Sequence, residues 1–124
     1  MNKRLGIYGG TFDPIHMGHL IVAQMSKEEC NLDKVLFIPA KTPPHKRDRD
    51  ISSENHRITM INLAIDSNLC FKTSEIEYKR QGISFTIDTL RDLRNEYPDE
   101  WEFWMIIGGD ALLELDSWKS AEDI

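Results

Sequence analysis

Cysteine is scarce in this chain of 124 residues, and long hydrophobic runs are absent. The two cysteines, Cys30 and Cys70, fit no metal-binding spacing, so we predict buried, reduced thiols in a cytoplasmic protein. After Lys3 and Arg4, Gly6, Gly9, Gly10 and Asp13 interrupt the sequence before an apolar h-region can form, so no signal peptide is expected. The longest apolar stretch, 103–107, is far shorter than the roughly 20 residues that cross a bilayer, which argues against a membrane protein.

Positive charge is also in short supply, because 15 lysines and arginines face 21 aspartates and glutamates for a net charge of −6. That balance, without interleaved basic and aromatic residues, argues against a broad nucleic-acid-binding face. It does not exclude a small anionic ligand, which needs only a local basic pocket. The sequence has no internal repeat and no low-complexity segment, and its hydrophobic content is 40%. We therefore expect one globular domain over residues 1–124.

Strand and helix patterns alternate along the chain. Strands are predicted at 4–8, 34–38, 71–76 and 101–107. Helices are predicted at 17–29, at 84–97 and, as a short helix, at 111–115. Another begins at Ser53 and Glu54, with Ile58, Ile61, Leu63 and Ile65 mostly inward. This order predicts an open parallel α/β sheet with helices on both faces. Ligands bind beyond the carboxyl ends of such strands, where segments 9–19, 39–47 and 108–118 fall.

The segment 9–20, GGTFDPIHMGHL, is the most informative of these. Free backbone N–H groups and the helix dipole at a strand-turn-helix junction favour an anion, and nearby imidazoles can neutralise charge on a reacting phosphate. Neither the dinucleotide fingerprint G-x-G-x-x-G nor the P-loop pattern is present. Two alternatives are an ordinary junction with incidental histidines and a metal site. The metal site lacks a third ligand at a familiar spacing.

The residues from Gly9 to His19 resemble the signature of the H-x-G-H nucleotidyltransferase superfamily. Members transfer a nucleotidyl group from a nucleoside triphosphate onto a phosphate and release pyrophosphate. The resemblance implies a Rossmann-like nucleotidyltransferase fold, of which the C-terminal part is expected to be missing here. The motif alone does not identify the acceptor.

Three further segments resemble the bacterial nicotinate mononucleotide adenylyltransferases within that superfamily. They are 43–46 (PPHK), 84–90 (SFTIDTL) and 106–113 (IIGGDALL) with Trp118 after it. Each also has a structural interpretation: a solvated basic turn for 43–46, a helix N-cap at Ser84 or Thr86, and a half-buried anchor for Trp118.

The resemblance implies roles for individual residues. It makes His16 and His19 the catalytic pair. The ATP- and phosphate-binding residues would be Gly9, Gly10, Thr11, Phe12, His45, Lys46, Gly108 and Asp110. Thr86 and Trp118 would bind the nicotinate. Asp13 is a weaker candidate at the phosphate cradle, with the alternative that it organises the turn through an Asx bond. No residue is assigned to a metal, because Mg²⁺ would accompany ATP and be held largely by phosphates and water.

The implied reaction is adenylyl transfer from ATP to nicotinate mononucleotide, giving nicotinate adenine dinucleotide and pyrophosphate. The family also carries a late S-x-T-x-x-R segment that is absent from these 124 residues, so the chain is expected to be an N-terminal portion. Two alternatives stay open: a mononucleotide-binding fragment without turnover, and an adenylyltransferase with another acceptor such as phosphopantetheine. A homo-oligomer and the preference between acid and amide mononucleotides also stay open.

Overall fold

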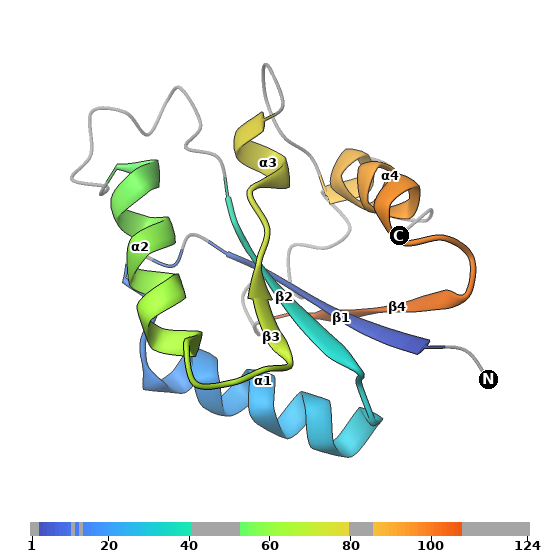
Figure 1. The fold of residues 1–124 in the computed structure, drawn as a ribbon, viewed down its shortest axis with the longest axis horizontal. Helices are drawn as coiled ribbons and strands as arrows, with labels where there is room; N and C mark the ends of the chain where they lie inside the picture. The colour runs from blue at the N-terminus through green and yellow to red at the C-terminus, as the bar shows by residue number, and fades with distance from the viewer. Residues whose placement is uncertain (1–2, 11, 13, 41–52, 80–85, 108–124) are drawn as a thin grey trace.

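A computed structural model describes residues 3–10, 12, 14–40, 53–79 and 86–107. Its strands are β1 (Lys3–Gly10), β2 (Lys34–Pro39), β3 (Phe71–Thr73) and β4 (Trp101–Ile106). Its helices are α1 (Met17–Cys30), α2 (Glu54–Ile65), α3 (Ile76–Lys79) and α4 (Thr86–Glu96). The strands form one parallel sheet in the order β3-β2-β1-β4 (Figure 1). The predicted open parallel α/β architecture is confirmed.

Two strand boundaries differ from the prediction. Strand β1 does not end at Tyr8, because Gly9 and Gly10 continue to pair with β2 and the amide of Ala40 donates to the Gly10 carbonyl at 2.7 Å. The glycines therefore end a strand and do not form the predicted turn. Strand β3 is shorter than the predicted 71–76, since the amide of Ile76 donates to Ser74 Oγ at 3.3 Å and a helix begins there.

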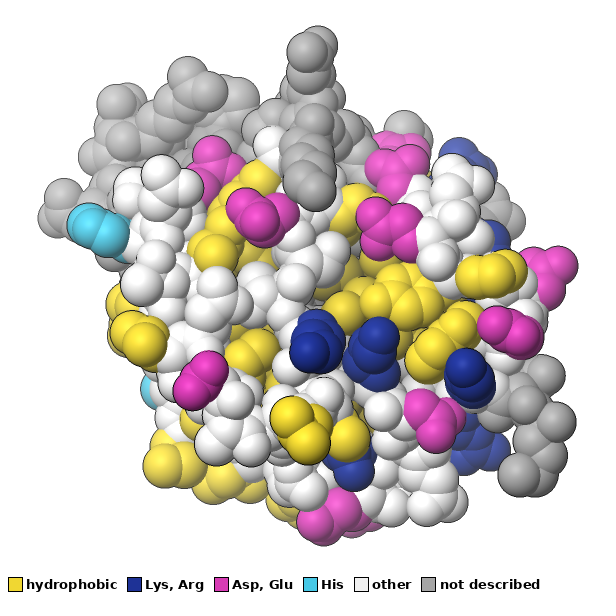
Figure 2. Space-filling view, in the orientation of Figure 1, with side chains coloured by type: hydrophobic (Ala, Val, Ile, Leu, Met, Phe, Trp, Pro, Cys, Tyr) yellow, Lys and Arg dark blue, Asp and Glu magenta, His cyan; other side chains and the backbone are white. Residues whose placement is uncertain are grey.

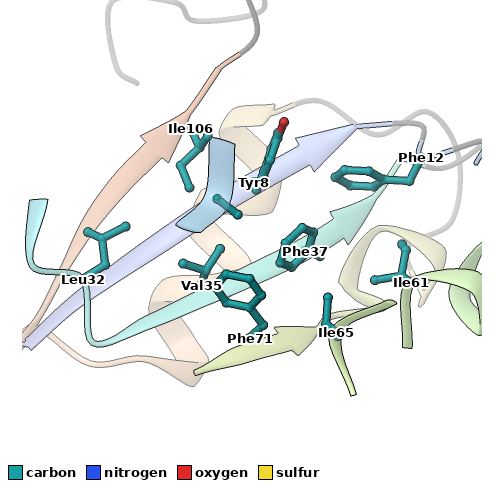
Figure 3. Close-up of a cluster of buried hydrophobic side chains, with 10 residues drawn as sticks. Tyr8, Phe12, Leu32, Val35, Phe37, Ile61, Ile65, Phe71 and Ile106 are labelled. Atoms are coloured by element: carbon teal, nitrogen blue, oxygen red, sulfur yellow. The ribbon is translucent and has the colours of Figure 1, made fainter. Parts of the chain in front are cut away.

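The core is divided by the sheet into two clusters. Helices α1 and α2 cover one face, and α3 and α4 cover the other. The first cluster, drawn in Figure 3, contains Tyr8, Phe12, Ala23, Leu32, Val35, Phe37, Ile61, Ile65, Phe71 and Ile106. The second contains Leu5, Ile7, Leu36, Ile38 and Leu93. Strands β1 and β2 are thus buried on both faces of the sheet, which explains their continuous apolar runs.

Helix α2 buries a stripe at Arg57, Ile61 and Ile65, four residues apart. Leu63 is 75% exposed, so its predicted inward orientation is wrong: it lies off that stripe. The prediction for the cysteines is also partly wrong. Both are free thiols, but each is half-buried and packs only at the margin of the first cluster.

The end of α4 is joined to β4 by the half-buried guanidinium of Arg94. Nη1 of Arg94 donates to the carbonyls of Pro98 and Trp101 at 3.1 and 2.7 Å, and the group lies 3.8 Å from the ring centroid of Phe103. Lys34 makes similar contacts with the rings of Tyr97 and Trp101. Figure 2 shows basic side chains beside hydrophobic ones on this face. Within the described ranges, no helix has the length and apolarity needed to cross a membrane.

Candidate functional site

The chain leaves β1 through an unusual backbone conformation at Phe12. Its φ is 48°, in the left-handed region that bulky residues seldom adopt. The conformation costs on the order of 1–2 kcal/mol. Burial of the ring offsets this cost, because Phe12 is 2% exposed and packs against Tyr8 and Phe37 at centroid distances of 5.5 and 5.8 Å. Figure 3 shows this ring beyond the end of β1.

Helix α1 begins with a reciprocal pair of hydrogen bonds made by two imidazoles. Nδ1 of His16 accepts the backbone N–H of Gly18 at 3.1 Å, and Nδ1 of His19 accepts the backbone N–H of His16 at 3.0 Å. The arrangement is a capping box in which histidines replace the usual Ser/Thr and Glu/Gln. An imidazole whose Nδ1 accepts carries its proton on Nε2 when neutral. Each ring is therefore left with one N–H donor.

The two rings also stack, with centroids 3.9 Å apart and planes inclined by 29°. His16 is exposed, whereas His19 is half-buried between His16, Phe12 and Tyr8. Burial lowers the pKa of His19 below 6.5, and the neighbouring His16 lowers it further. His19 is thus held mainly neutral at neutral pH, as a hydrogen-bond donor at the N-terminus of a helix.

The glycine between the histidines leaves space for the ring of His16. A Cβ at position 18 would lie 2.9 Å from Cε1 of His16 and 3.1 Å from its Nδ1. A Cβ at position 18 would therefore require the His16 ring to move away from the first turn, where its Nδ1 accepts the amide of Gly18. The spacing H-x-G-H therefore has a local steric explanation.

Arg57 is a residue of this edge that the sequence analysis missed. It is 1% exposed, and its Nη1 donates to the carbonyl of Ala40 at 2.8 Å, directly after β2. Its guanidinium lies 5.5 Å from the ring centroid of Tyr78 in α3. Arg57 therefore joins α2, the end of β2 and α3. The sequence could have revealed the burial of Arg57, because Arg57 is spaced i, i+4, i+8 with Ile61 and Ile65 and so lies on the same apolar stripe of the helix.

The other predicted site residues divide into two groups. Gly9 and Gly10 lie at the carboxyl end of β1, and Thr86 is the first residue of α4. Because the ring of Phe12 is buried, only its backbone is available to a phosphate. The remaining candidates lie outside the described residues: Thr11, Asp13, Ser84, His45, Lys46, Gly108, Asp110 and Trp118. Within the described part of the chain, no group of three His, Cys, Asp or Glu side chains could hold a metal ion.

Several curated proteins are similar to this chain over nearly all of its length. A probable nicotinate-nucleotide adenylyltransferase of Thermoanaerobacter sp. (strain X514) is 46% identical over 121 residues, which cover 98% of this chain and 57% of that protein. Another, from Oceanobacillus iheyensis, is 45% identical over 122 residues, covering 98% and 63%. The chain therefore spans less than two thirds of the length of these relatives.

Solved structures share the fold. The Plasmodium falciparum nicotinic acid mononucleotide adenylyltransferase complexed with NaAD superposes with a TM-score of 0.81 at 21% identity, covering 98% of this chain and 59% of that one. A putative nicotinate-nucleotide adenylyltransferase from Vibrio parahaemolyticus gives 0.78 at 22% identity, covering 98% and 71%. The profile of the cytidylyltransferase-like family matches residues 7–124. The chain belongs to the cytidylyltransferase-like family of nucleotidyltransferases.

Proposed function

We propose that this chain carries the histidine-containing part of an enzyme that transfers an adenylyl group from ATP to nicotinate mononucleotide, in the cytoplasm. The observation that carries the proposal is the pair of Nε2–H donors of His16 and His19 at the N-terminus of α1. The similarity to curated nicotinate-nucleotide adenylyltransferases supports the choice of nucleotide and acceptor. The products would be nicotinate adenine dinucleotide and pyrophosphate.

In the proposed reaction an oxygen of the acceptor 5′-phosphate attacks the α-phosphorus of ATP. The new bond joins that oxygen to the α-phosphorus, while the bond to the oxygen bridging the β-phosphorus breaks and its electrons leave with pyrophosphate. The acceptor phosphate is already an anion at neutral pH, so no general base is required. Catalysis then comes from positioning and from donors directed at the developing charge.

The described histidines suit this donor role better than a proton-transfer role. Their Nδ1 atoms already accept backbone amides, so protonating either ring there would break a hydrogen bond of the helix cap. The lowered pKa of His19 also disfavours protonation of its ring. We therefore assign both residues to hydrogen bonding with phosphate oxygens through Nε2–H.

The remaining assignments follow the family resemblance and are part of the proposal. The phosphates of ATP would contact Gly9, Gly10, Thr11, the backbone of Phe12, His45, Lys46 and Gly108, with Asp110 near the ribose. Thr86 and Trp118 would hold the nicotinate. Mg²⁺ would arrive with ATP. The described histidine side chains at this edge offer imidazole nitrogens, whereas Mg²⁺ prefers oxygen ligands, so phosphates and water would hold it and none of these residues is assigned to the ion.

Replacing each histidine by alanine tests the proposal. For His19→Ala we expect turnover, followed as pyrophosphate release, to fall much more than nucleotide affinity measured by calorimetry. His56→Ala is the matched control, because His56 is exposed on α2. Near-normal turnover in His19→Ala would contradict the assigned role. ATP or mononucleotide binding without turnover in the parent chain would favour a binding fragment, and turnover with phosphopantetheine instead would reassign the acceptor.

A further inference from the structure

Phe12 joins the strained junction to the catalytic pair. Its ring centroid lies 5.0 Å from that of His19 with the planes at 73°, an edge-to-face contact. The ring of Tyr8 approaches the same imidazole at 6.0 Å and 66°. We infer that Phe12 is a positioning residue for His19: with Tyr8 it forms an aromatic wall that holds the imidazole in the orientation that leaves Nε2–H free.

The backbone at Phe12 has the conformation this contact requires. A φ of 48° turns the side chain back over the end of β1, where it enters the core between Tyr8 and Phe37. The ring lies over Gly10, where a Cβ would be in ordinary van der Waals contact with Cζ of Phe12 at 3.4 Å. The strained backbone thus places the Phe12 ring against the core on one side and against His19 on the other.

The wall restricts the rotation of the imidazole. With Phe12 and Tyr8 on one side and His16 stacked at 3.9 Å on another, the His19 ring cannot turn about its Cβ–Cγ bond without losing edge-to-face or stacking contact. Rotation would also remove Nδ1 from the amide of His16. Without the wall, the two neutral tautomers and several orientations of His19 become accessible, and the Nε2–H donor is no longer fixed.

The catalytic part of this inference rests on the proposed function, whereas the orientation of His19 does not. The test therefore reads the two separately. The ¹⁵N spectra of His19 report which ring nitrogen carries the proton, in the parent chain, in Phe12→Leu and in Phe12→Met. The matched control is Phe71→Leu, because Phe71 belongs to the same core cluster and its ring contacts Phe37, not His19. Turnover of each protein is measured in parallel.

We expect the parent and Phe71→Leu to show well-separated Nδ1 and Nε2 resonances of an Nε2–H tautomer, and both Phe12 variants to lose that separation. Turnover should fall on the order of 10- to 100-fold in the Phe12 variants, with a smaller change in KM, as expected for a misplaced group. Unchanged His19 spectra in a folded Phe12 variant would overturn the inference. If neither variant folds, the absence of nuclear Overhauser contacts between the Phe12 and His19 rings of the parent would overturn it. Altered spectra in the Phe12 variants, together with no adenylyl transfer by the parent chain, would retain the aromatic wall and favour a binding fragment over the proposed turnover.

Discussion

The imidazole of His16 lies over Gly18 so closely that a Cβ at position 18 would be only 2.9 Å from Cε1 of His16. The imidazole occupies the space that any other residue would fill. This contact makes the glycine part of the geometry of the histidine pair.

Gly18→Ala tests this relationship. Alanine in a helix normally gains about 0.5–1 kcal/mol over glycine. Here we expect no such gain, because the His16 ring must move and its hydrogen bond with the amide of residue 18 is lost. Turnover should fall while the free energy of unfolding stays within about 1 kcal/mol of the parent. Thermal unfolding and pyrophosphate release measure both.

Gly9→Ala is the steric control for the stability measurement, since a Cβ there meets only the carbonyl oxygen of Ile38 at 3.9 Å. A Gly18→Ala protein that is more stable than the parent and turns over at the same rate would contradict the steric role.

His19 should make stability depend on pH. Its pKa in the folded protein is lowered from 6.5 by burial and then by His16, so the unfolded chain binds the proton more readily. The contribution of His19 to the free energy of unfolding is fully present above the pKa of this residue in the unfolded chain, and it decreases as the pH falls below about 6.5. His19→Gln keeps an acceptor for the His16 amide but cannot titrate. We expect denaturant unfolding of the variant to show a weaker loss of stability between about pH 7 and 5. Identical pH profiles would argue against a lowered pKa.

Tyr78 should make the stability of the protein depend on pH above about pH 10. Burial raises its pKa from 10.0 to about 12, although the Arg57 charge opposes the shift. Because the folded state holds the proton more tightly, this contribution is present below pH 10 and is lost as pH rises toward 12. In Tyr78→Phe we expect one fewer tyrosine in the high-pH step of an ultraviolet titration.

The same variant should be as stable as the parent at neutral pH or slightly more stable. Its buried hydroxyl has no hydrogen-bond partner among the described residues, so removing it relieves a desolvation cost. A clear destabilisation at neutral pH would show that the hydroxyl is bonded. Tyr8, whose pKa is also raised by burial, remains in both proteins and accounts for the residual step.

Arg57→Met should destabilise the protein by about 1–3 kcal/mol, because a charge-assisted hydrogen bond is lost and the carbonyl of Ala40 loses a buried donor. Methionine keeps most of the apolar stem, which limits the cavity. Arg91→Met, at an exposed position of α4, is the control and should change stability by no more than about 0.5 kcal/mol. If chemical denaturation shows equal losses of stability in the two variants, Arg57 does not stabilise this edge of the sheet.

The alternation of apolar runs and helical patterns was sufficient to predict the parallel sheet, because each element's periodicity is local. The errors occurred where a distant partner decided the outcome. The glycines after Tyr8 remain in β1 because Ile38 and Pro39 lie beside them. Leu63 is exposed because the buried stripe of α2 passes through Arg57, Ile61 and Ile65.

The histidine pair and its i, i+3 spacing at the start of a helix were determined by the sequence itself, since capping depends on neighbouring residues. Only the tertiary structure decided how those histidines are presented. The burial of His19 and the left-handed conformation of Phe12 depend on Tyr8 and Phe37, which belong to separate strands of the sheet. A sequence pattern records which donors are available. The packing of distant aromatic rings determines which nitrogen is protonated and where it points.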